Sequence, residues 1–143
     1  MKLILKKGIA DLLFGMKQQD VEKLIGKSDL HFKDDDNNAI HVYNKLKLRL
    51  TFYEDEGFRL GYVISANPEL ELDGHPLIGK TVETIKENLP KSFKTWEVER
   101  FDLATNHFNE ANWLILQEEF GIVAKVEMGA VFNDKDEVEW AFK

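Results

Sequence analysis

The chain has 143 residues, 43% of them hydrophobic and 31% charged, and it contains no cysteine. Ten Phe, three Trp and three Tyr argue against disorder, and the length predicts a single domain over residues 1–143. The missing cysteine excludes disulfides, thiolate catalysis and cysteine-ligated zinc. No stretch approaches the ~18 apolar residues of a membrane span, and Lys6 and Lys7 interrupt the apolar N-terminal segment. We therefore expect a cytoplasmic protein with no membrane partner.

The net charge of −7 and the pI of about 5.1 limit the class of partner. Proteins that bind nucleic acid normally carry a basic patch, so nucleic acid is not an expected partner. An acidic surface serves solubility in most proteins. It also suits a protein that binds a basic protein, because complementary charge speeds encounter.

Two segments of the chain are similar: FGMKQQDVEKLIGKS (14–28) and IGKTVETIKENLPKS (78–92). The same offset, which places position 14 on position 78, pairs KLKLRLTFYEDEGFRLGYVIS (45–65) with NEANWLILQEEFGIVAKVEMG (109–129) without a gap. Turn glycines, acidic pairs and apolar alternation all agree at this one offset. The sequence therefore predicts an internal duplication, with halves of about 1–72 and 73–143.

The first half begins with a helix over 18–25, whose apolar stripe is Val21, Leu24 and Ile25 and whose stop is Gly26. Strands follow. Strict alternation over 45–52 and 58–65 predicts two of them, and 39–44 and 69–72 are two more.

The second half repeats this order. Val82, Ile85 and Leu89 form the helical stripe and Pro90 ends the helix. The expected strands are 96–101, 112–119, 121–132 and 137–142. The predicted fold class is α+β, with two α-β-β-β-β pseudo-repeats that form a curved antiparallel sheet and with helices on one face of it.

Known catalytic and metal motifs do not occur. The four histidines form no HExxH pair, and we expect them on the surface or on edge strands. Asp34, Asp36 and Asn38 match the start of a calcium loop, but Ala39 and Lys45 stand where glycine and a bidentate glutamate belong. No nucleophile elbow, GxGxxG or P-loop occurs. We expect no enzyme, no catalytic residue, no cofactor and no metal.

The two halves differ on the outer face of the predicted sheet. At the offset of the repeat, Arg49 and Thr51 correspond to Trp113 and Ile115. These two apolar side chains either pack under a loop or against the other half, or they anchor a binding site, since Trp is common at interface hot spots. The candidate partner-binding residues are Trp113, Ile115, Tyr53, Glu97, Glu99, Glu137 and Glu139.

The start of each helix carries a short motif, G-x-[ST]-x-x-x-[VI]. It stands as Gly15 to Val21, with Lys17 where Ser or Thr is usual, and as Gly79 to Ile85. In this motif and in its two helix-plus-meander halves the chain resembles the tandem-repeat modules of the β-lactamase-inhibitor-protein and SmpA/OmlA type. The resemblance implies a scaffold and transfers no active-site residue.

In size, charge and shape the chain is also similar to bacterial immunity proteins, which bind a cognate toxin and block it. We therefore expect a non-catalytic immunity or inhibitor protein, monomeric or weakly dimeric, that binds a basic protein partner such as a nuclease toxin domain. A self-associating scaffold or assembly module is the alternative. A small-molecule-binding domain would need a concave apolar pocket that the sequence does not indicate.

Overall fold

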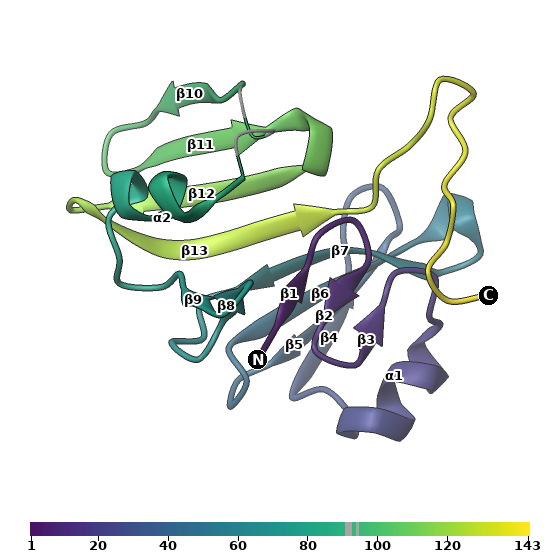
Figure 1. Ribbon diagram of the computed structural model, residues 1–143. Coiled ribbons are helices and arrows are strands. Elements are labelled where there is room, and N and C mark those ends of the chain that lie inside the picture. The colour runs from purple at the N-terminus through teal and green to yellow at the C-terminus, as the bar shows by residue number, and fades with distance from the viewer. Residues whose placement is uncertain (91–92, 94) are drawn as a thin grey trace.

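A computed structural model describes residues 1–90, 93 and 95–143. Lys91 and Ser92, which end the second copy of the repeated segment, lie outside the described residues. Within these residues the fold is mixed α/β, built mostly of antiparallel strands with two helices (Figure 1). This confirms the predicted α+β class at the level of its elements.

The main sheet has eight strands in the order β10-β11-β12-β13-β7-β6-β5-β4. Its strands are, in chain order, β4 (Leu30–Lys33), β5 (Ala39–Tyr43), β6 (Leu48–Tyr53), β7 (Arg59–Ser65), β10 (Glu97–Arg100), β11 (Thr105–Asn109), β12 (Leu114–Glu119) and β13 (Ile122–Gly129). Each half of the chain contributes a four-stranded meander. The two meanders join where β7 pairs with β13, from Val126 opposite Ser65 to Gly129 opposite Tyr62.

Shorter elements complete the fold. They are β1 (Leu3–Ile4), β2 (Gly8–Ile9) and β3 (Leu12–Leu13), the hairpin of β8 (Glu71–Leu72) with β9 (His75–Pro76), and the 3₁₀ turns η1 (Glu54–Glu56) and η2 (Glu110–Asn112). The helices are α1 (Gln18–Ile25) and α2 (Val82–Asn88). Neither of these helices, among the residues described, is long and apolar enough to cross a membrane.

Local chemistry sets the bounds of both helices. At the start of α1 the backbone N–H of Lys17 donates to the Asp20 carboxylate at 3.0 Å. Gly26 ends the helix with φ of 81°, a left-handed value that glycine adopts at little cost. The Thr81 hydroxyl caps α2 by accepting from the Thr84 N–H at 3.2 Å, and Pro90 follows the helix.

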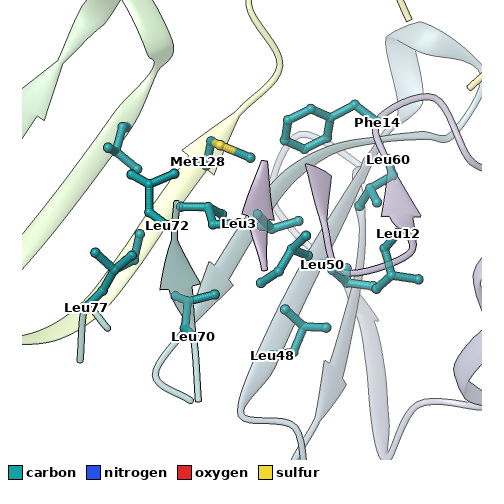
Figure 2. Close-up of a cluster of buried hydrophobic side chains, with 14 of the residues drawn as sticks. Leu3, Leu12, Phe14, Leu48, Leu50, Leu60, Leu70, Leu72, Leu77 and Met128 are labelled. Carbon is teal, nitrogen blue, oxygen red and sulfur yellow. The ribbon is translucent and has the colours of Figure 1, made fainter. Parts of the chain in front are cut away.

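One hydrophobic core lies between the sheet and the elements that cover it. Residues from both helices, β1–β3 and β8 belong to a single buried cluster with the sheet, so all of them cover the same face. Figure 2 shows Leu3 of β1 and Leu72 of β8 in the same cluster as Leu50 of β6 and Met128 of β13. The opposite face, called the outer face below, carries the alternate residues of each strand.

Several predicted elements differ from the structure. Residues 137–142 form no strand, because both neighbours of β13 in the sheet, β12 and β7, are already paired with it. Residues 69–72 contribute only β8, which pairs with β9 outside the main sheet. The strands β4 and β11 were not predicted. In α1, Leu24 is 50% exposed, so the buried stripe is narrower than expected.

Candidate binding surface

One end of the sheet gathers both 3₁₀ turns and the exit of the last strand. The turn η1 follows β6, and η2 precedes β12. Met128 pairs with both Leu114 and Val63, so the C-terminus of β13 lies beside the start of β12 and the first half of β7, on the same side of the sheet as both turns. From there the chain forms a C-terminal hairpin over 132–138, closed by the bridge of Phe132 with Val138. Figure 1 shows this hairpin, in yellow, extending beyond the sheet.

Trp113 is held on the outer face by its backbone and by its neighbours. It follows η2 in the left-handed conformation, with φ of 46° and ψ of 53°. Its indole packs edge-on against the Phe108 ring, with 5.0 Å between the ring centroids. A Cβ at Gly129 would lie 2.6 Å from the indole Cδ1, so only glycine leaves room for the ring there. Trp113 remains 40% exposed, so the indole is fixed and still accessible.

A hollow of about 660 Å³ opens beside this indole. We call it the acidic hollow; its lining residues are Thr95, Glu97, Phe108, Asn109, Glu110, Ala111, Trp113, Val131, Phe132 and Asp136. Among the described residues, the lining holds three carboxylates, three aromatic rings and no Lys or Arg. An apolar wall with carboxylates at hand suits a cationic group with an aliphatic stem.

A second hollow of about 660 Å³ lies on the η1 side of the same hairpin, and it shares Phe132 and Asp136 with the acidic hollow. Asp36, Asn38, Tyr53, Asp55 and Glu56 complete its lining. Burial raises the pKa of Tyr53 to about 12, so its hydroxyl keeps its proton at neutral pH. A side-chain hydrogen bond with Asp55, together with the charge of Asp55, raises the pKa of Glu54. Carboxylates are therefore crowded at η1 as well.

The other meander has a hollow of opposite charge. It measures about 290 Å³ and is lined by Val42, Tyr43, Asn44, Lys47, Leu48, Arg49, Ile64, Ala66 and Lys125, which in the described part of the chain supply three cationic side chains and no carboxylate. We call it the basic hollow. Its turn carries Lys47 in the left-handed conformation directly before β6, as Trp113 stands directly before β12. Trp113 therefore corresponds in the structure to Lys47, two residues away from the Arg49 that the gap-free offset gave.

The structure distributes the predicted site residues over three places. Trp113 and Glu97 line the acidic hollow, and Tyr53 lines its neighbour across the hairpin. In the sheet, Ile115 of β12 and Glu97 of β10 both lie opposite Phe108 of β11. Glu99 follows Glu97 by two residues on the same strand.

Glu137 and Glu139 do not line the acidic hollow. They line a different hollow, beside Lys6 and Lys7, which shares Val131 and Phe132 with the acidic one. Their predicted position depended on a strand over 137–142, which does not form.

The sequence analysis missed all lining residues of the acidic hollow except Trp113 and Glu97, and the aromatic and acidic ones among those missed are Phe108, Glu110, Phe132 and Asp136. The alternation of His107, Phe108 and Asn109 was available as a signal for Phe108. No local pattern indicates that the C-terminal hairpin approaches η2. Within the ranges that the structure describes, no three His, Asp or Glu side chains gather closely enough to hold a metal ion.

No protein-family model and no curated protein matches the chain. A similar solved structure is an extracellular protein containing a SCP domain from Bacillus anthracis str. Ames. The likeness has a TM-score of 0.51 at 11% sequence identity and covers 81% of this chain. The chain spans 43% of the length of that protein. At this identity the likeness shows a shared fold.

This comparison corrects the predicted location. We expected a cytoplasmic protein, and the similar structure belongs to an extracellular one. The expectation was wrong. It relied on the absence of cysteine, of a membrane span and of a recognisable targeting pattern, and a chain that buries a core of this size needs no disulfide in any compartment.

Proposed function

We propose that this protein is a non-catalytic binding module that takes a basic segment of a protein partner into the acidic hollow. The observation that carries the proposal is the fixed, 40% exposed Trp113 indole in a lining whose described residues include Glu97, Glu110 and Asp136 and no Lys or Arg. A preorganised Trp loses little entropy on binding, and such residues are common at the centre of interfaces.

The binding mode follows from this lining. A lysine or arginine side chain of the partner lays its aliphatic stem and cation against the indole and the Phe132 ring, in a cation–π arrangement. The carboxylates of Glu97 and Asp136 then pair with the cationic head. The net charge of −7 speeds the encounter with a basic partner over a longer range.

Inhibition of a basic toxin domain is the specific form of this function that we propose, in the manner of an immunity protein. The fold is shared with an extracellular protein. We therefore propose that the partner is met outside the cytoplasm.

We also propose that the chain arose by duplication and forms one curved sheet from two pseudo-repeats. The shift that carries position 14 onto position 78 also carries α1 onto 82–89, where α2 spans Val82–Asn88. A shift longer by two positions carries β5 and β6 onto 105–109 and 114–119, which are the bounds of β11 and β12. The acidic hollow and the basic hollow would then derive from one ancestral site, and their charges would have diverged.

The test is a titration of the labelled protein with an arginine-rich peptide, followed through backbone amide and indole N–H resonances. We expect shifts at Trp113 and Glu110 that weaken with salt, and none with a glutamate-rich peptide of equal length. Trp113→Ala should weaken binding about tenfold or more. Lys47→Ala, at the corresponding turn, is the matched control and should leave binding unchanged. Equal response to both peptides, or shifts away from the acidic hollow, would contradict the proposal.

The alternative function, self-association through the same face, is favoured by the exposed Phe132 beside Trp113, at 42% and 40%. Sedimentation separates the two functions. A dimer that dissociates in the Trp113→Ala variant would support self-association. Formation of that dimer would also compete with binding of the arginine-rich peptide.

A further inference from the structure

The strand β4 is an open edge of the eight-stranded sheet, and β5 is its neighbour on one side. All four of its residues are exposed. Two of them are large and apolar and belong to the outer face: Leu30 is 56% exposed and Phe32 40%. An exposed edge strand is a template for pairing with another chain unless charges, bulges or a covering segment prevent it.

The ladder with β5 determines which backbone groups of β4 are free to pair. Asp34 donates its N–H to the Asn38 carbonyl at 3.1 Å, and hydrogen-bonded pairs alternate along an antiparallel ladder. Phe32 and Leu30, two and four residues back, therefore bond to β5. The Asp29 N–H also bonds to β5, because it donates to the Val42 carbonyl at 2.9 Å. The N–H and C=O groups of His31 and Lys33 point to the open side, ready to bond to a further strand.

We propose that two copies of this chain associate through β4, antiparallel, about a two-fold axis at His31. In this register His31 lies opposite itself and exchanges two backbone hydrogen bonds with its copy. On the outer face Leu30 of one copy lies opposite Phe32 of the other. On the inner face Asp29 lies opposite Lys33. The segment Asp29–Lys33 is thus complementary to itself in both apolarity and charge.

The side chains of β4 make contacts within their own chain that such pairing would adjust. Asp29 is exposed, and one of its carboxylate oxygens accepts from the Asn44 N–H at 2.7 Å on the β5 side. The Lys33 ammonium lies 5.3 Å from the centroid of the Phe58 ring, so both charged side chains turn toward the edge when the copies associate. The guanidinium of Arg49 lies 5.4 Å from the centroid of the Phe32 ring, which holds that ring over the outer face. The two-fold operation repeats each contact, so two ion pairs and two apolar pairs form at once.

Other registers that satisfy the same backbone groups are worse. A shift by two residues in one direction sets Lys33 opposite His31 and Leu30 opposite Asp34. A shift in the other direction sets Lys33 opposite Lys27. Like charges directly opposite one another destabilise a strand pair, and so does a carboxylate opposite an exposed leucine. The register about His31 is the one that matches both faces.

The other edge of the sheet, β10, does not offer this self-complementarity. Phe101 donates its N–H to the Ala104 carbonyl at 2.7 Å, so Val98 and Arg100 carry the open backbone groups. The two registers of largest overlap set Glu99 opposite Glu97 or opposite itself. Repulsion between these carboxylates protects β10 from pairing with its own copy. Association therefore closes as a dimer and does not continue into a fibre.

The experiment uses charge variants in the full chain, with sedimentation over a range of concentrations. Asp29→Lys and Lys33→Asp should each weaken the dimer about tenfold, because each turns two attractive pairs into repulsive ones. An equimolar mixture of the two variants should recover association as a heterodimer, since each Lys then faces an Asp. The double variant, with the charges exchanged, should dimerise about as well as the wild type.

The mixture keeps the test independent of folding, because a misfolded variant could not be rescued by the other. A wild-type chain that stays monomeric at every concentration would overturn the proposal. A dimer that neither single variant weakens would overturn it as well, and so would single variants that fail to associate in the mixture. Trp113→Ala should leave this dimer intact, which separates it from the peptide site.

Discussion

The turn before β6 and the turn before β12 have the same backbone and different chemistry. Lys47 and Trp113 have φ of 49° and 46°, and each donates its N–H to the carbonyl three residues earlier, at 3.2 and 3.1 Å. Their carbonyls accept from Ala66 and Gly129, at 3.1 and 3.0 Å. One turn thus presents a lysine in a basic hollow, and the other presents an indole in an acidic one.

This difference shows how one scaffold can carry two surfaces. The backbone hydrogen bonds and the inner leucines of both turns are the same, so the scaffold does not depend on the residue at the left-handed position. Replacing Ala66 by its counterpart Gly129 removes one Cβ and makes room for an indole. Function can therefore diverge at the turns without a change in the fold.

The same comparison extends to the inner face. His41 lies opposite Leu50 and His107 opposite Leu116, so the two histidines occupy corresponding positions. Both are buried, which corrects the surface or edge location predicted from sequence. His41 contacts the neutral groups of Ser28 and Gln18 at 2.9 and 2.7 Å.

His107 has charged neighbours instead. Glu118 and Lys86 each lie 3.3 Å from its ring nitrogens. The two buried histidines therefore lie in different electrostatic surroundings.

The largest expected effect tests whether corresponding leucines on the inner faces of the two meanders contribute equally to stability. Leu48 and Leu114 follow the two turns and are 3% and 0% exposed. Truncation of either to Ala should lower the free energy of unfolding by about 2–5 kcal/mol, from lost burial and the cavity left behind. Urea unfolding of both variants measures this, and a clearly smaller cost at one site would break the equivalence.

A smaller effect is expected where the turns differ. Gly129→Ala places a Cβ 2.6 Å from the Trp113 indole and should cost about 1–3 kcal/mol by overpacking. It should also shift the indole N–H resonance and weaken peptide binding. Ala66→Gly is the control at the other turn, with an expected cost of at most about 1 kcal/mol from backbone entropy. An unmoved indole resonance in Gly129→Ala would show that the glycine does not seat the ring.

The smallest expected effect concerns pH. Burial, and next the charge of His31, lower the pKa of His41, although Glu22 opposes the shift. The unfolded state then binds more protons than the folded state just below pH ~6.5, the ordinary value for histidine. The stabilisation from a neutral His41 is therefore complete above about pH 6.5 and is lost as the pH falls through the folded-state pKa.

The urea midpoint should accordingly drop between about pH 7.5 and about pH 5.5, and His41→Gln should reduce that drop. His75→Gln, at an exposed position on β9, should leave the drop as it is. An equal drop in all three proteins would assign the pH dependence to other groups.

Sequence alignment of the two halves failed in an instructive way. The gap-free offset that places position 14 on position 78 matches the helices, but β5 and β6 correspond to β11 and β12 at an offset longer by two. Segment lengths explain this. The segment from the start of α2 to the start of β11 is two residues longer than the segment from the start of α1 to the start of β5. The turn after β12 (120–121) is shorter than the turn after β6 (54–58), so the offset falls again beyond these strands. Apolar alternation has a period of two, so a slip of two residues leaves the pattern intact and the error invisible.

Strand prediction failed where pairing is decided by distant segments. Residues 137–142 alternate well and form no strand: in the described part of the chain they make the isolated bridge of Val138 with Phe132 and the bond from the Phe142 N–H to the Phe14 carbonyl at 3.0 Å, and no continuous ladder. The strands β4 and β11 carry only short alternating stretches, LHFK and HFN, and each of them is paired: β4 with β5, and β11 between β10 and β12. Alternation shows that a segment can lie on a half-buried sheet, and a neighbour with free backbone groups decides whether it does.

The sequence by itself determined the local features of this protein. The extent of α1 and its end at Gly26, the alternating strands of β6 and β12, and the acidic charge all follow from nearby residues. Tertiary structure alone decided that β7 pairs with β13, that the C-terminal hairpin meets η2, and that Trp113 lies over Gly129. The physical reason is distance along the chain. Capping and periodicity act within a few residues, whereas sheet order and the shape of a hollow depend on which distant segments satisfy each other's backbone and fill each other's space.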